Sequence, residues 1–349
     1  MKIRTLLVDG ENLLKRSFHG AMEVQTKAGY VGALYSFLTT IRKLIREYKI
    51  NKVVLVWDGE NGGVFRYQID SNYKANRKSK KWYDKIELTD AEIRKEKDKE
   101  ESILKQRQRI KAYAEELFLR QIEADDVEAD DIIAQYCLDH NNKEEIFLFS
   151  NDRDFAQLLD LNITIIFPNI QQLVTKTNYM MHFDHHYSNA LIMKIICGDA
   201  SDNIKGVGGL KDKGLVKLFP ELRFKTMTVR EICRRADEIN AERIANKKKP
   251  LKALENIVNN VPRLRTNFKL VNLREPMLTE EAREEIQQLE IPLSPENRGS
   301  KNLYKLMLED GFLSIYGSSF PQYVEPFYTV IMNEKQLLTE YYRKHKDNM

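Results

Sequence analysis

Residues 122–133 read Ile-Glu-Ala-Asp-Asp-Val-Glu-Ala-Asp-Asp-Ile-Ile, with five carboxylates in the seven positions 125–131. Ile132, Ile133, Tyr136 and Cys137 follow at helical spacing, so the acidic cluster opens a predicted helix. Acidic residues in a first helical turn complement the positive end of the helix macrodipole, which is a purely structural explanation. The cluster becomes informative about function if carboxylates recur at equivalent structural points elsewhere in the chain.

Short apolar runs that end in aspartate do recur. The runs and the carboxylates that follow them are residues 3–8 with Asp9, residues 53–57 with Asp58, and residues 146–150 with Asp152 and Asp154. Runs of this length indicate buried strands, and a further run lies at residues 163–167. Residues 31–48 carry apolar side chains at helical spacing. Strands alternating with helices favour an α/β fold with a central, mainly parallel sheet flanked by helices.

The carboxyl ends of parallel strands share one edge of the sheet, where ligands bind. We therefore expect Asp9, Asp58 and the pair Asp152/Asp154 on one rim, with the acidic cluster facing it. Crowded like charges are costly unless cations compensate them. One such aspartate could instead be a helix N-cap, a position that Asp favours. We take the interpretation that all of them are only caps to be the weaker one.

Composition places the chain among soluble globular proteins. It has 349 residues, of which 42% are hydrophobic and 31% charged, and a net charge of +4. No apolar run approaches the roughly 18 residues of a membrane helix, and the N-terminus fits a first strand better than a signal peptide. Three widely spaced cysteines fit a reducing, cytoplasmic compartment. The charge balance suits a polyanionic partner such as nucleic acid better than a membrane.

Residues 66–83 interleave cations with aromatic rings. Cations contact phosphates and aromatic faces stack on unpaired bases, and the candidates for these contacts are Tyr73, Lys78, Lys81 and Trp82. Residues 84–116 are densely charged in both signs, which predicts one or two solvated helices without a strong core face. Residues of about 84–116 form either a mobile surface insertion or a functional one, and the sequence leaves both open.

A glycine-rich turn follows the α/β pattern. Residues 187–196 predict a helix, residues 206–214 a tight turn, and residues 215–219 a second helix. This is the pattern of a helix-hairpin-helix at about residues 188–219, which holds a DNA backbone without reading its sequence. Its expected contacts are Gly206, Gly208, Gly209, Lys211 and Lys213. The basic run at residues 243–250 is either a solvated linker or a further phosphate contact, and we favour the linker.

These motifs, taken in chain order, resemble the 5′-nuclease superfamily of flap endonucleases and 5′→3′ exonucleases, most closely the replication nucleases of bacteriophages. The resemblance spans roughly residues 3–220. Besides the strand-end aspartates it rests on Tyr73-Lys74-x-Asn76-Arg77, Val127-Glu128-Ala129-Asp130-Asp131, Asp152-x-Asp154 and Gly198-Asp199-x-x-Asp202-Asn203-Ile204. It implies an α/β nuclease domain over residues 1–185, with residues 66–116 as a helical arch or clamp. Residues 186–349 would be a helical DNA-binding domain that ends in a C-terminal extension.

The resemblance also implies phosphodiester hydrolysis with two Mg²⁺ ions, for which Mn²⁺ could substitute. Asp9, Asp58, Glu128 and Asp130 would hold the first ion, and Asp152, Asp154 and Asp199 the second, with Asp131 and Asp202 in support. Lys74 and Arg77 would face the scissile phosphate. Oxygen ligands without His or Cys suit these hard cations, and two ions roughly 3.5–4 Å apart serve both the attacking and the leaving oxygen. The implied products end in 5′-phosphate and 3′-hydroxyl.

The implied substrates are DNA with 5′ ends, flaps or nicks, and RNA primers on DNA, cleaved by a cytoplasmic monomer during phage replication or repair. A replication single-strand-binding protein is a candidate partner. Lys211 occupies the last glycine position of the hairpin in many relatives, which puts a K⁺ site in doubt. The alternatives are a PIN-type metal-dependent ribonuclease and a DNA-structure-binding module without catalysis. The sequence leaves open whether exonuclease or flap cleavage dominates.

Overall fold

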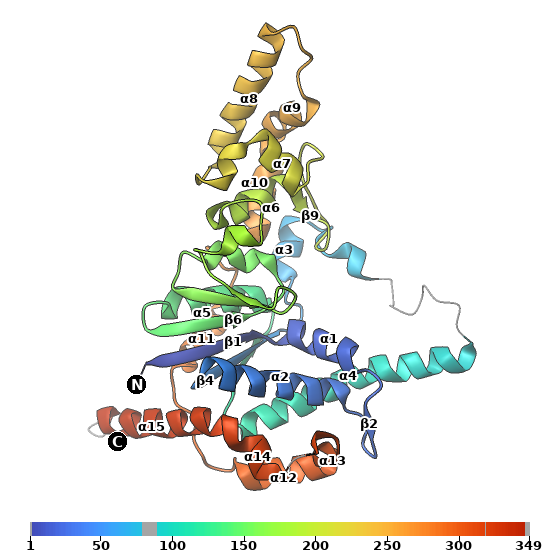
Figure 1. Ribbon diagram of the computed structural model, residues 1–349, viewed down its shortest axis with the longest axis vertical. Coiled ribbons are helices and arrows are strands. Elements are labelled where there is room, and N and C mark those ends of the chain that lie inside the picture. The colour runs from blue at the N-terminus through green and yellow to red at the C-terminus, as the bar shows by residue number, and fades with distance from the viewer. Residues whose placement is uncertain (1, 79–88, 318, 346–349) are drawn as a thin grey trace. The chain divides into compact units, whose positions relative to one another are not determined.

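The computed structural model describes residues 2–78, 89–317 and 319–345 (Figure 1). The chain forms two compact units. One, here called the sheet unit, comprises Met1–Glu60, Lys81–Ser150 and Leu278–Met349, and the other, the hairpin unit, comprises Asn61–Lys80 and Asn151–Met277. The boundaries of these units differ from the expected domain boundary between residues 185 and 186, which remains a prediction. No helix within the described ranges is long and apolar enough to cross a membrane.

The sheet unit is built on four parallel strands in the order β5-β4-β1-β6. They are β1 (Ile3–Asp9), β4 (Lys52–Asp58), β5 (Arg120–Ala124) and β6 (Glu144–Phe149). The apolar runs predicted to form β1, β4 and β6 do so, and the mainly parallel α/β fold is confirmed. Because the chain passes from β1 to β4 and β5 and then returns to β6 on the other side of β1, the strand order reverses beside β1. That is where α/β sheets bind ligands.

Helices connect and cover these strands. The helix predicted for residues 31–48 is confirmed as α2 (Gly32–Tyr48), which packs against α1 (Gly10–Ala21), and α5 (Ala129–His140) contacts β1 and β4. The other elements of the unit are β2 (Gln25–Thr26), β3 (Gly29–Tyr30), α4 (Asp90–Glu116), α11 (Glu280–Gln288), α12 (Ser300–Glu309), α13 (Phe312–Tyr316), α14 (Phe320–Val324), η6 (Glu325–Phe327) and α15 (Tyr328–His345).

Helix α4 corrects one expectation. We expected no strong core face in residues 84–116, yet the second half of α4 buries Gln106, Ile110 and Tyr113. The Tyr113 hydroxyl donates to Asp310 Oδ2 over 2.9 Å, and Arg109 donates to the same oxygen. The anchoring partner lies nearly two hundred positions away, so the local charge pattern of α4 did not reveal it.

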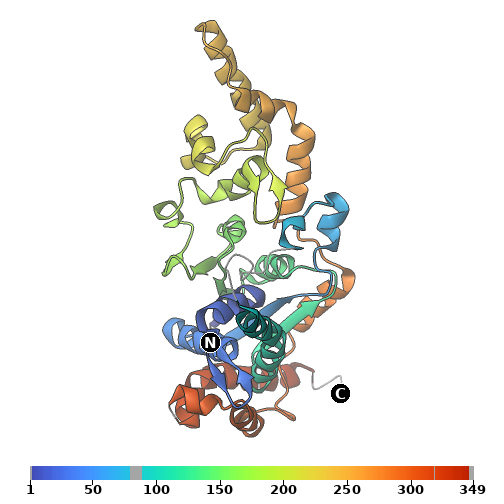
Figure 2. The same ribbon diagram turned by 90° about the vertical axis from the view of Figure 1, so that its right-hand side faces the viewer.

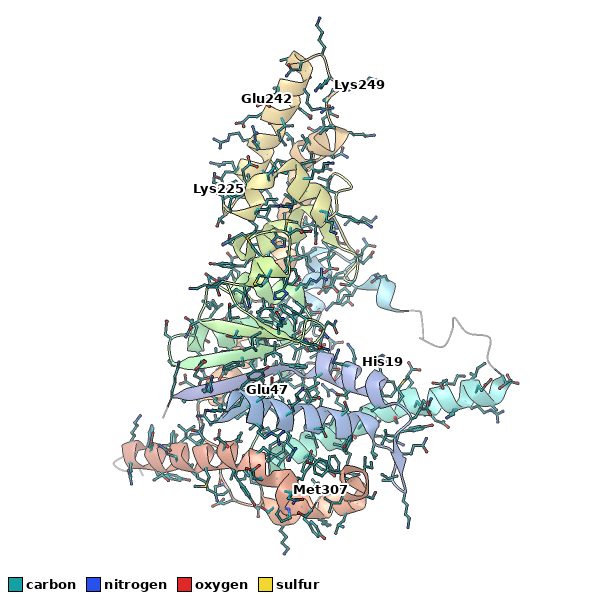
Figure 3. All side chains as sticks on the ribbon, viewed as in Figure 1. His19, Glu47, Lys225, Glu242, Lys249 and Met307 are labelled. Carbon is teal, nitrogen blue, oxygen red and sulfur yellow. The ribbon has the colours of Figure 1, made fainter. Side chains whose placement is uncertain are left out.

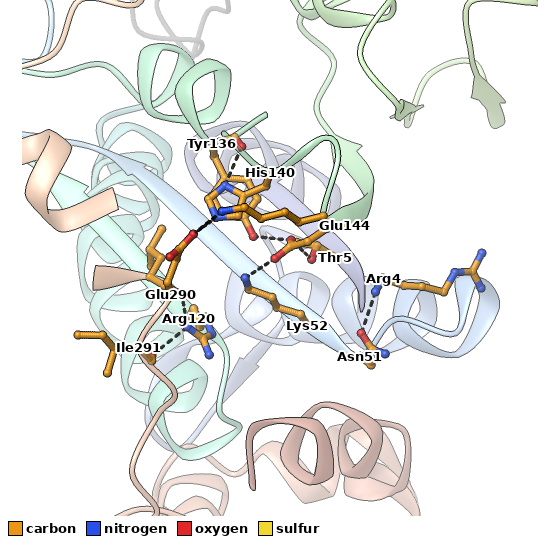
Figure 4. Close-up of polar contacts among 12 residues, drawn as sticks. Arg4, Thr5, Asn51, Lys52, Arg120, Tyr136, His140, Glu144, Glu290 and Ile291 are labelled. Atoms are coloured by element: carbon orange, nitrogen blue, oxygen red, sulfur yellow. Dashed lines mark hydrogen bonds and ion pairs between the residues drawn. The ribbon is translucent and has the colours of Figure 1, made fainter. Parts of the chain in front are cut away.

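A buried polar network ties the starts of three strands together (Figure 4). Glu144 accepts hydrogen bonds from Lys52 Nζ over 2.7 Å, from Thr5 Oγ1 over 2.5 Å and from the Tyr136 hydroxyl over 2.7 Å. Burial alone would raise the pKa of Glu144, but the Lys52 charge outweighs it and holds that pKa below its usual value. Buried charges persist only when they are paired and hydrogen-bonded in this way. The network fixes the edge of the sheet opposite the carboxyl ends of the strands.

The hairpin unit is mostly helical (Figure 2). Its elements are α3 (Val64–Ile69), η1 (Ala75–Lys78), η2 (Arg153–Leu158), β7 (Ile163–Phe167), β8 (Gln172–Val174), η3 (Tyr179–Met181), η4 (Tyr187–Asn189), α6 (Ala190–Cys197), β9 (Gly198–Asp199), β10 (Ile204–Lys205), α7 (Asp212–Leu218), η5 (Pro220–Arg223), α8 (Val229–Ala245), α9 (Lys252–Asn259) and α10 (Val261–Val271). Strands β7 and β8 pair antiparallel. Apolar side chains from α6, α7, α8, α9 and α10 form its core, which includes Tyr73.

Candidate active site

The sheet unit presents Asp9 at the carboxyl end of β1. Its side chain is 7% exposed and accepts two hydrogen bonds, one from the Asn12 amide over 2.9 Å and one from Ser150 Oγ over 2.9 Å. The first bond caps helix α1, and the second joins the end of β1 to the residue that follows β6. Both contacts fix the carboxylate at the point where the strand order reverses.

Asp58 ends the neighbouring strand β4 and is exposed. Its Oδ1 accepts a hydrogen bond from the Ala129 amide over 2.9 Å, so Asp58 caps helix α5 from a different element. Gly59 is required next to it, because a Cβ there would collide with the Ala124 carbonyl. This close approach brings the end of β4 to the start of the acidic cluster.

The carboxylates of the acidic cluster at the start of α5 differ in their solvent exposure. Glu128 stands at the N-cap position and is 5% exposed, Asp131 is 1% exposed, and Asp130 is half-buried. Sequence reasoning treated capping and a shared rim as rival explanations, and the structure corrects that choice. Asp9 and Asp58 both cap helices, yet they also lie at the carboxyl ends of adjacent strands. Capping fixes the positions of these carboxylates at the ends of their strands.

The hairpin unit holds the other nominated carboxylates. Asp152 caps η2 through the Asp154 amide, over 2.8 Å. The Lys194 ammonium, on α6, lies 2.6 Å from Asp154 Oδ1 and also contacts Asp199 Oδ2. Asp199 accepts further hydrogen bonds from the Ser201 amide and hydroxyl, over 2.7 and 2.5 Å. Asp154 and Asp199 are therefore brought together around one cation, Lys194, which sequence reasoning missed.

These contacts set the charge states of the group. Burial, followed by the nearby charge of Asp152, raises the pKa of Asp154 to about 7 despite Lys194. Burial alone would also raise the pKa of Asp199, but the Lys194 ammonium outweighs it and lowers that pKa to about 2. The neighbouring carboxylates outweigh the burial of Lys194 and raise the pKa of its ammonium. The two carboxylates thus differ in pKa because they differ in their neighbours.

Lys74 is tied to the same group. Its backbone amide donates to the Asp202 carbonyl over 2.8 Å, and its φ of 51° places it in the left-handed region. The flanking residues repeat the link, since Asn76 Nδ2 donates to the Ala200 carbonyl over 2.9 Å and Asn203 Nδ2 to the Asn72 carbonyl over 2.7 Å. The segment predicted to supply a catalytic lysine is thus hydrogen-bonded to the loop that contains Asp199 and Asp202.

The glycine-rich turn is confirmed as a connection between two helices, α6 and α7. Strands β9 and β10 pair antiparallel at its base. Gly208 and Gly209 have φ of 77° and 64°, which glycine adopts without a steric penalty, and a Cβ at Gly206 would collide with the Cys197 carbonyl. Lys211 and Lys213 are exposed at the start of α7.

The donor chemistry fits a hard divalent cation. No three Asp, Glu, His or Cys side chains among the described residues converge closely enough to hold a metal ion by themselves. Mg²⁺ is nevertheless commonly held by one or two carboxylates, with water and substrate phosphate completing its octahedron. The Asp154/Asp199 pair, which already holds one cation, meets that requirement.

Comparisons with known proteins bear on this geometry. The family model of the 5′-3′ exonuclease N-terminal resolvase-like domain matches residues 4–187. The chain belongs to the 5′-3′ exonuclease family. It is 28% identical to a 5′-3′ exonuclease of Mycoplasmopsis pulmonis over 61% of this chain and 65% of that protein, and 30% identical to one of Halalkalibacterium halodurans over 62% and 69%. It thus matches a little under two thirds of the length of the first of these relatives.

Solved structures share the fold of this exonuclease-family chain. The 5′-exonuclease of bacteriophage T5, solved with zinc bound, superposes with a TM-score of 0.59 at 21% identity, over 89% of this chain and 99% of the other. The bacteriophage T5 flap endonuclease in complex with DNA and metal ions gives 0.60 at 20% identity, over 90% and 100%. Human GEN1 with Holliday junction DNA gives 0.50 at 14%, over 95% and 73%.

The structure describes only some of the remaining predicted site residues of this exonuclease-family chain. Tyr73 is 3% exposed in the core of the hairpin unit, where its hydroxyl lies 3.4 Å from Asp202 Oδ2, which corrects our expectation that its ring face is available to a base. Arg77 and Lys78 belong to η1. Lys81 and Trp82 lie outside the described residues.

Proposed function

We propose that this chain is a divalent-metal-dependent 5′→3′ exonuclease and flap endonuclease that hydrolyses phosphodiesters of DNA, and RNA primers on DNA. The observation that carries the proposal is the pair Asp154/Asp199, held around the Lys194 ammonium and linked through the Asp199–Asp202 loop to Lys74. A set of oxygen ligands beside a lysine suits phosphoryl transfer, in which anionic oxygens need compensation. Membership of the 5′-3′ exonuclease family supports the same reaction. Phage DNA replication or repair is the setting that we infer.

The residues that would hold Mg²⁺ are grouped by unit. They are Asp9, Asp58, Glu128 and Asp130 in the sheet unit, and Asp152, Asp154 and Asp199 in the hairpin unit, with Asp131 and Asp202 in support. When bound, a pair of divalent ions lowers the pKa of a water nucleophile and offsets charge on the leaving oxygen. The chain's own contribution is preorganisation: Ser201 orients Asp199, and Ser150 orients Asp9. Mn²⁺ would serve the same ligands.

Lys74 and Arg77 would act on the phosphoryl group. A cation aimed at oxygens where charge develops stabilises the transition state more than the ground state. Hydrogen bonds link Asn72, Lys74 and Asn76 to the Ala200–Asn203 loop and so fix the position of the Lys74 backbone. The hairpin lysines Lys211 and Lys213 would grip the duplex part of the substrate, and a K⁺ ion there is not part of the proposal.

Cleavage of end-labelled substrates tests the proposal. We expect 5′-flap, nicked and blunt duplexes to be cut with Mg²⁺ and left intact with EDTA, with products that end in 5′-phosphate. Asp9→Ala and Asp154→Ala should each abolish cutting while DNA binding in Ca²⁺ persists, because both remove candidate ligands. The matched control is Asp139→Ala, which removes an exposed carboxylate from the far end of α5.

Three results would contradict the proposal. Wild-type-like turnover by both ligand variants would refute the metal assignment. Cleavage of single-stranded RNA alone would favour a PIN-type ribonuclease. DNA binding without any cutting in Mg²⁺ or Mn²⁺ would favour a structure-binding module.

A further inference from the structure

The basic run between α8 and α9 is an ordered loop. Two backbone bonds close the end of α8, from Lys247 N to Ile244 O over 2.9 Å and from Lys248 N to Arg243 O over 2.8 Å. Arg243 Nε then donates to the Lys249 carbonyl over 3.0 Å, which ties the loop back to the helix. These contacts give residues 243–250, which we interpret as a solvated linker, fixed hydrogen bonds to the helix that precedes them.

The far side of the loop is fixed as well. Asn240, which is 9% exposed, accepts from the Leu251 amide over 2.8 Å and donates to the Leu251 carbonyl over 3.3 Å. The side chain of this nearly buried asparagine thus satisfies both backbone hydrogen-bonding groups of Leu251, the residue that precedes α9. Figure 3 labels Glu242 and Lys249, which lie near the two ends of this turn. The loop has a defined backbone from the end of α8 to the start of α9.

The cations that the loop displays differ from those of α8. Arg235 lies within 3.2 to 3.7 Å of Glu221, Glu238 and Glu242, and is satisfied within the unit. Lys247, Lys248 and Lys249 are exposed, and none of the ion pairs among the described residues includes them. Three lysines on an ordered loop, without a carboxylate partner, form a patch of uncompensated positive charge. Such a patch favours binding of an anionic ligand from outside the chain.

The loop is joined to the hairpin. Helix α9 begins at Lys252, and a Cβ at hairpin Gly208 would lie 2.8 Å from the Ala253 carbonyl, so the hairpin backbone packs directly on the first turn of α9. Lys249 is four residues before Ala253, and a chain of that length spans at most about 14 Å. Since one base pair occupies about 3.4 Å of duplex axis, the loop lies within roughly four base pairs of the hairpin.

We propose that the loop Lys247–Lys249 is a second phosphate-binding site that continues the duplex contact of the hairpin along the same DNA. This inference rests on the proposed function, because it takes DNA to be the ligand. The occupant is the sugar–phosphate backbone of a duplex, contacted without base readout. A duplex that covers both sites gains the phosphate contacts of the loop in addition to those of the hairpin.

Binding of a fluorescent blunt duplex of about 24 base pairs and of its single strand, titrated with salt in Ca²⁺, tests the inference. Each phosphate contact contributes about 0.9 to the slope of log K against log salt. For Lys247→Gln/Lys248→Gln/Lys249→Gln we expect a slope reduced by about 2.7 on the duplex. Lys247→Arg/Lys248→Arg/Lys249→Arg should keep the slope. Lys211→Gln/Lys213→Gln should reduce it as well.

A charge-matched control is Lys301→Gln/Lys305→Gln/Lys335→Gln, three exposed lysines of the sheet unit. It should leave the slope unchanged. An equal loss in this control, or no loss in the loop variant, would each overturn the inference. So would an equal loss on single strands, because the site would then not be one for duplex. Failure of the proposed function is seen separately, as wild-type protein that does not cut flaps in Mg²⁺.

Discussion

At the scale of single residues, Lys194 is the least expected finding. Its ammonium neutralises two carboxylates that are candidate metal ligands, so lysine and divalent ion compete for the same oxygens. Lys194→Met should therefore lower the melting temperature in EDTA, because Asp154 and Asp199 lose their counter-charge. It should also enlarge the rise in melting temperature that Mg²⁺ produces, because ligands bind more tightly where no lysine opposes them.

Calorimetry of both proteins, with and without Mg²⁺, measures the two effects of Lys194→Met. Lys217→Met, at an exposed position on α7, is the control and should change neither. If Mg²⁺ raises the melting temperature of Lys194→Met by no more than it raises that of the wild type, lysine and metal do not share these oxygens.

Lys74 is expected to act on chemistry more than on affinity. Lys74→Ala should slow single-turnover flap cleavage by about 10²–10³, the usual cost of removing one preorganised donor, with a much smaller change in Kd. Single-turnover rates at saturating enzyme measure this. Lys80→Ala is the comparison within the same insertion and should do less. A Lys74→Ala protein that cleaves normally once bound, but binds weakly, would make Lys74 a phosphate tether.

His140 gives the fold a pH dependence. Burial lowers its pKa in the folded protein, so the unfolded chain takes up this proton at higher pH than the folded one does. Stability from His140 is therefore complete above about pH 6.5 and is lost as pH falls below that value, with a slope of at most about 1.4 kcal/mol per pH unit. His140→Gln should flatten the decline between about pH 6.5 and 5. Urea unfolding across that range measures it, with the exposed His19→Gln as control. An unchanged decline would contradict the assignment.

At the scale of elements, the hairpin depends on glycine at one position and not at another. A Cβ at Gly206 would collide with the Cys197 carbonyl, whereas one at Gly214 meets only Leu210 Cδ2 at 3.6 Å. Gly206→Ala should weaken duplex binding and lower the melting temperature. Gly214→Ala, inside α7, should bind normally and be stabilised by up to about 1 kcal/mol. Equal behaviour of the two variants would mean that the turn tolerates a side chain, against the geometry described here.

Elements differ in how far the sequence predicts them. Strands β1 and β4 were predictable because each is a continuous apolar run that ends in aspartate. Strand β5 was not, because Arg120, Gln121 and Glu123 interrupt the pattern, and Arg120 is buried only through a partner distant in sequence. The burial of Tyr73 and the ion pairs of Lys194 likewise depend on tertiary contacts that the sequence pattern does not show. Residue type nominated the carboxylates, but only the fold showed that Asp9 and Asp58 also cap helices.

At the scale of the whole molecule, one ion pair joins the C-terminal segment to the sheet. Arg120 donates to both oxygens of Glu334, over 2.8 and 2.7 Å, and the two side chains are 2% and 1% exposed. Glu334→Gln should cost about 3–5 kcal/mol of unfolding free energy, since it leaves a buried charge unpaired. The double variant Arg120→Met/Glu334→Leu should recover most of that loss. Denaturant unfolding measures both, and Lys305→Ala, in an exposed pair, should cost at most about 1 kcal/mol. A loss below that for Glu334→Gln would contradict the role of the pair.

The separation of that pair has a consequence for synthesis. Arg120 and Glu334 are 214 positions apart, so at about 5–20 residues per second a ribosome needs roughly 10 to 40 seconds to deliver the second after the first. Every candidate metal ligand, from Asp9 to Asp202, has by then been translated. A nascent chain stalled before residue 334 thus carries all the carboxylates of the site but not the residue that closes the sheet unit. The sheet unit is complete only once residue 334 has been translated.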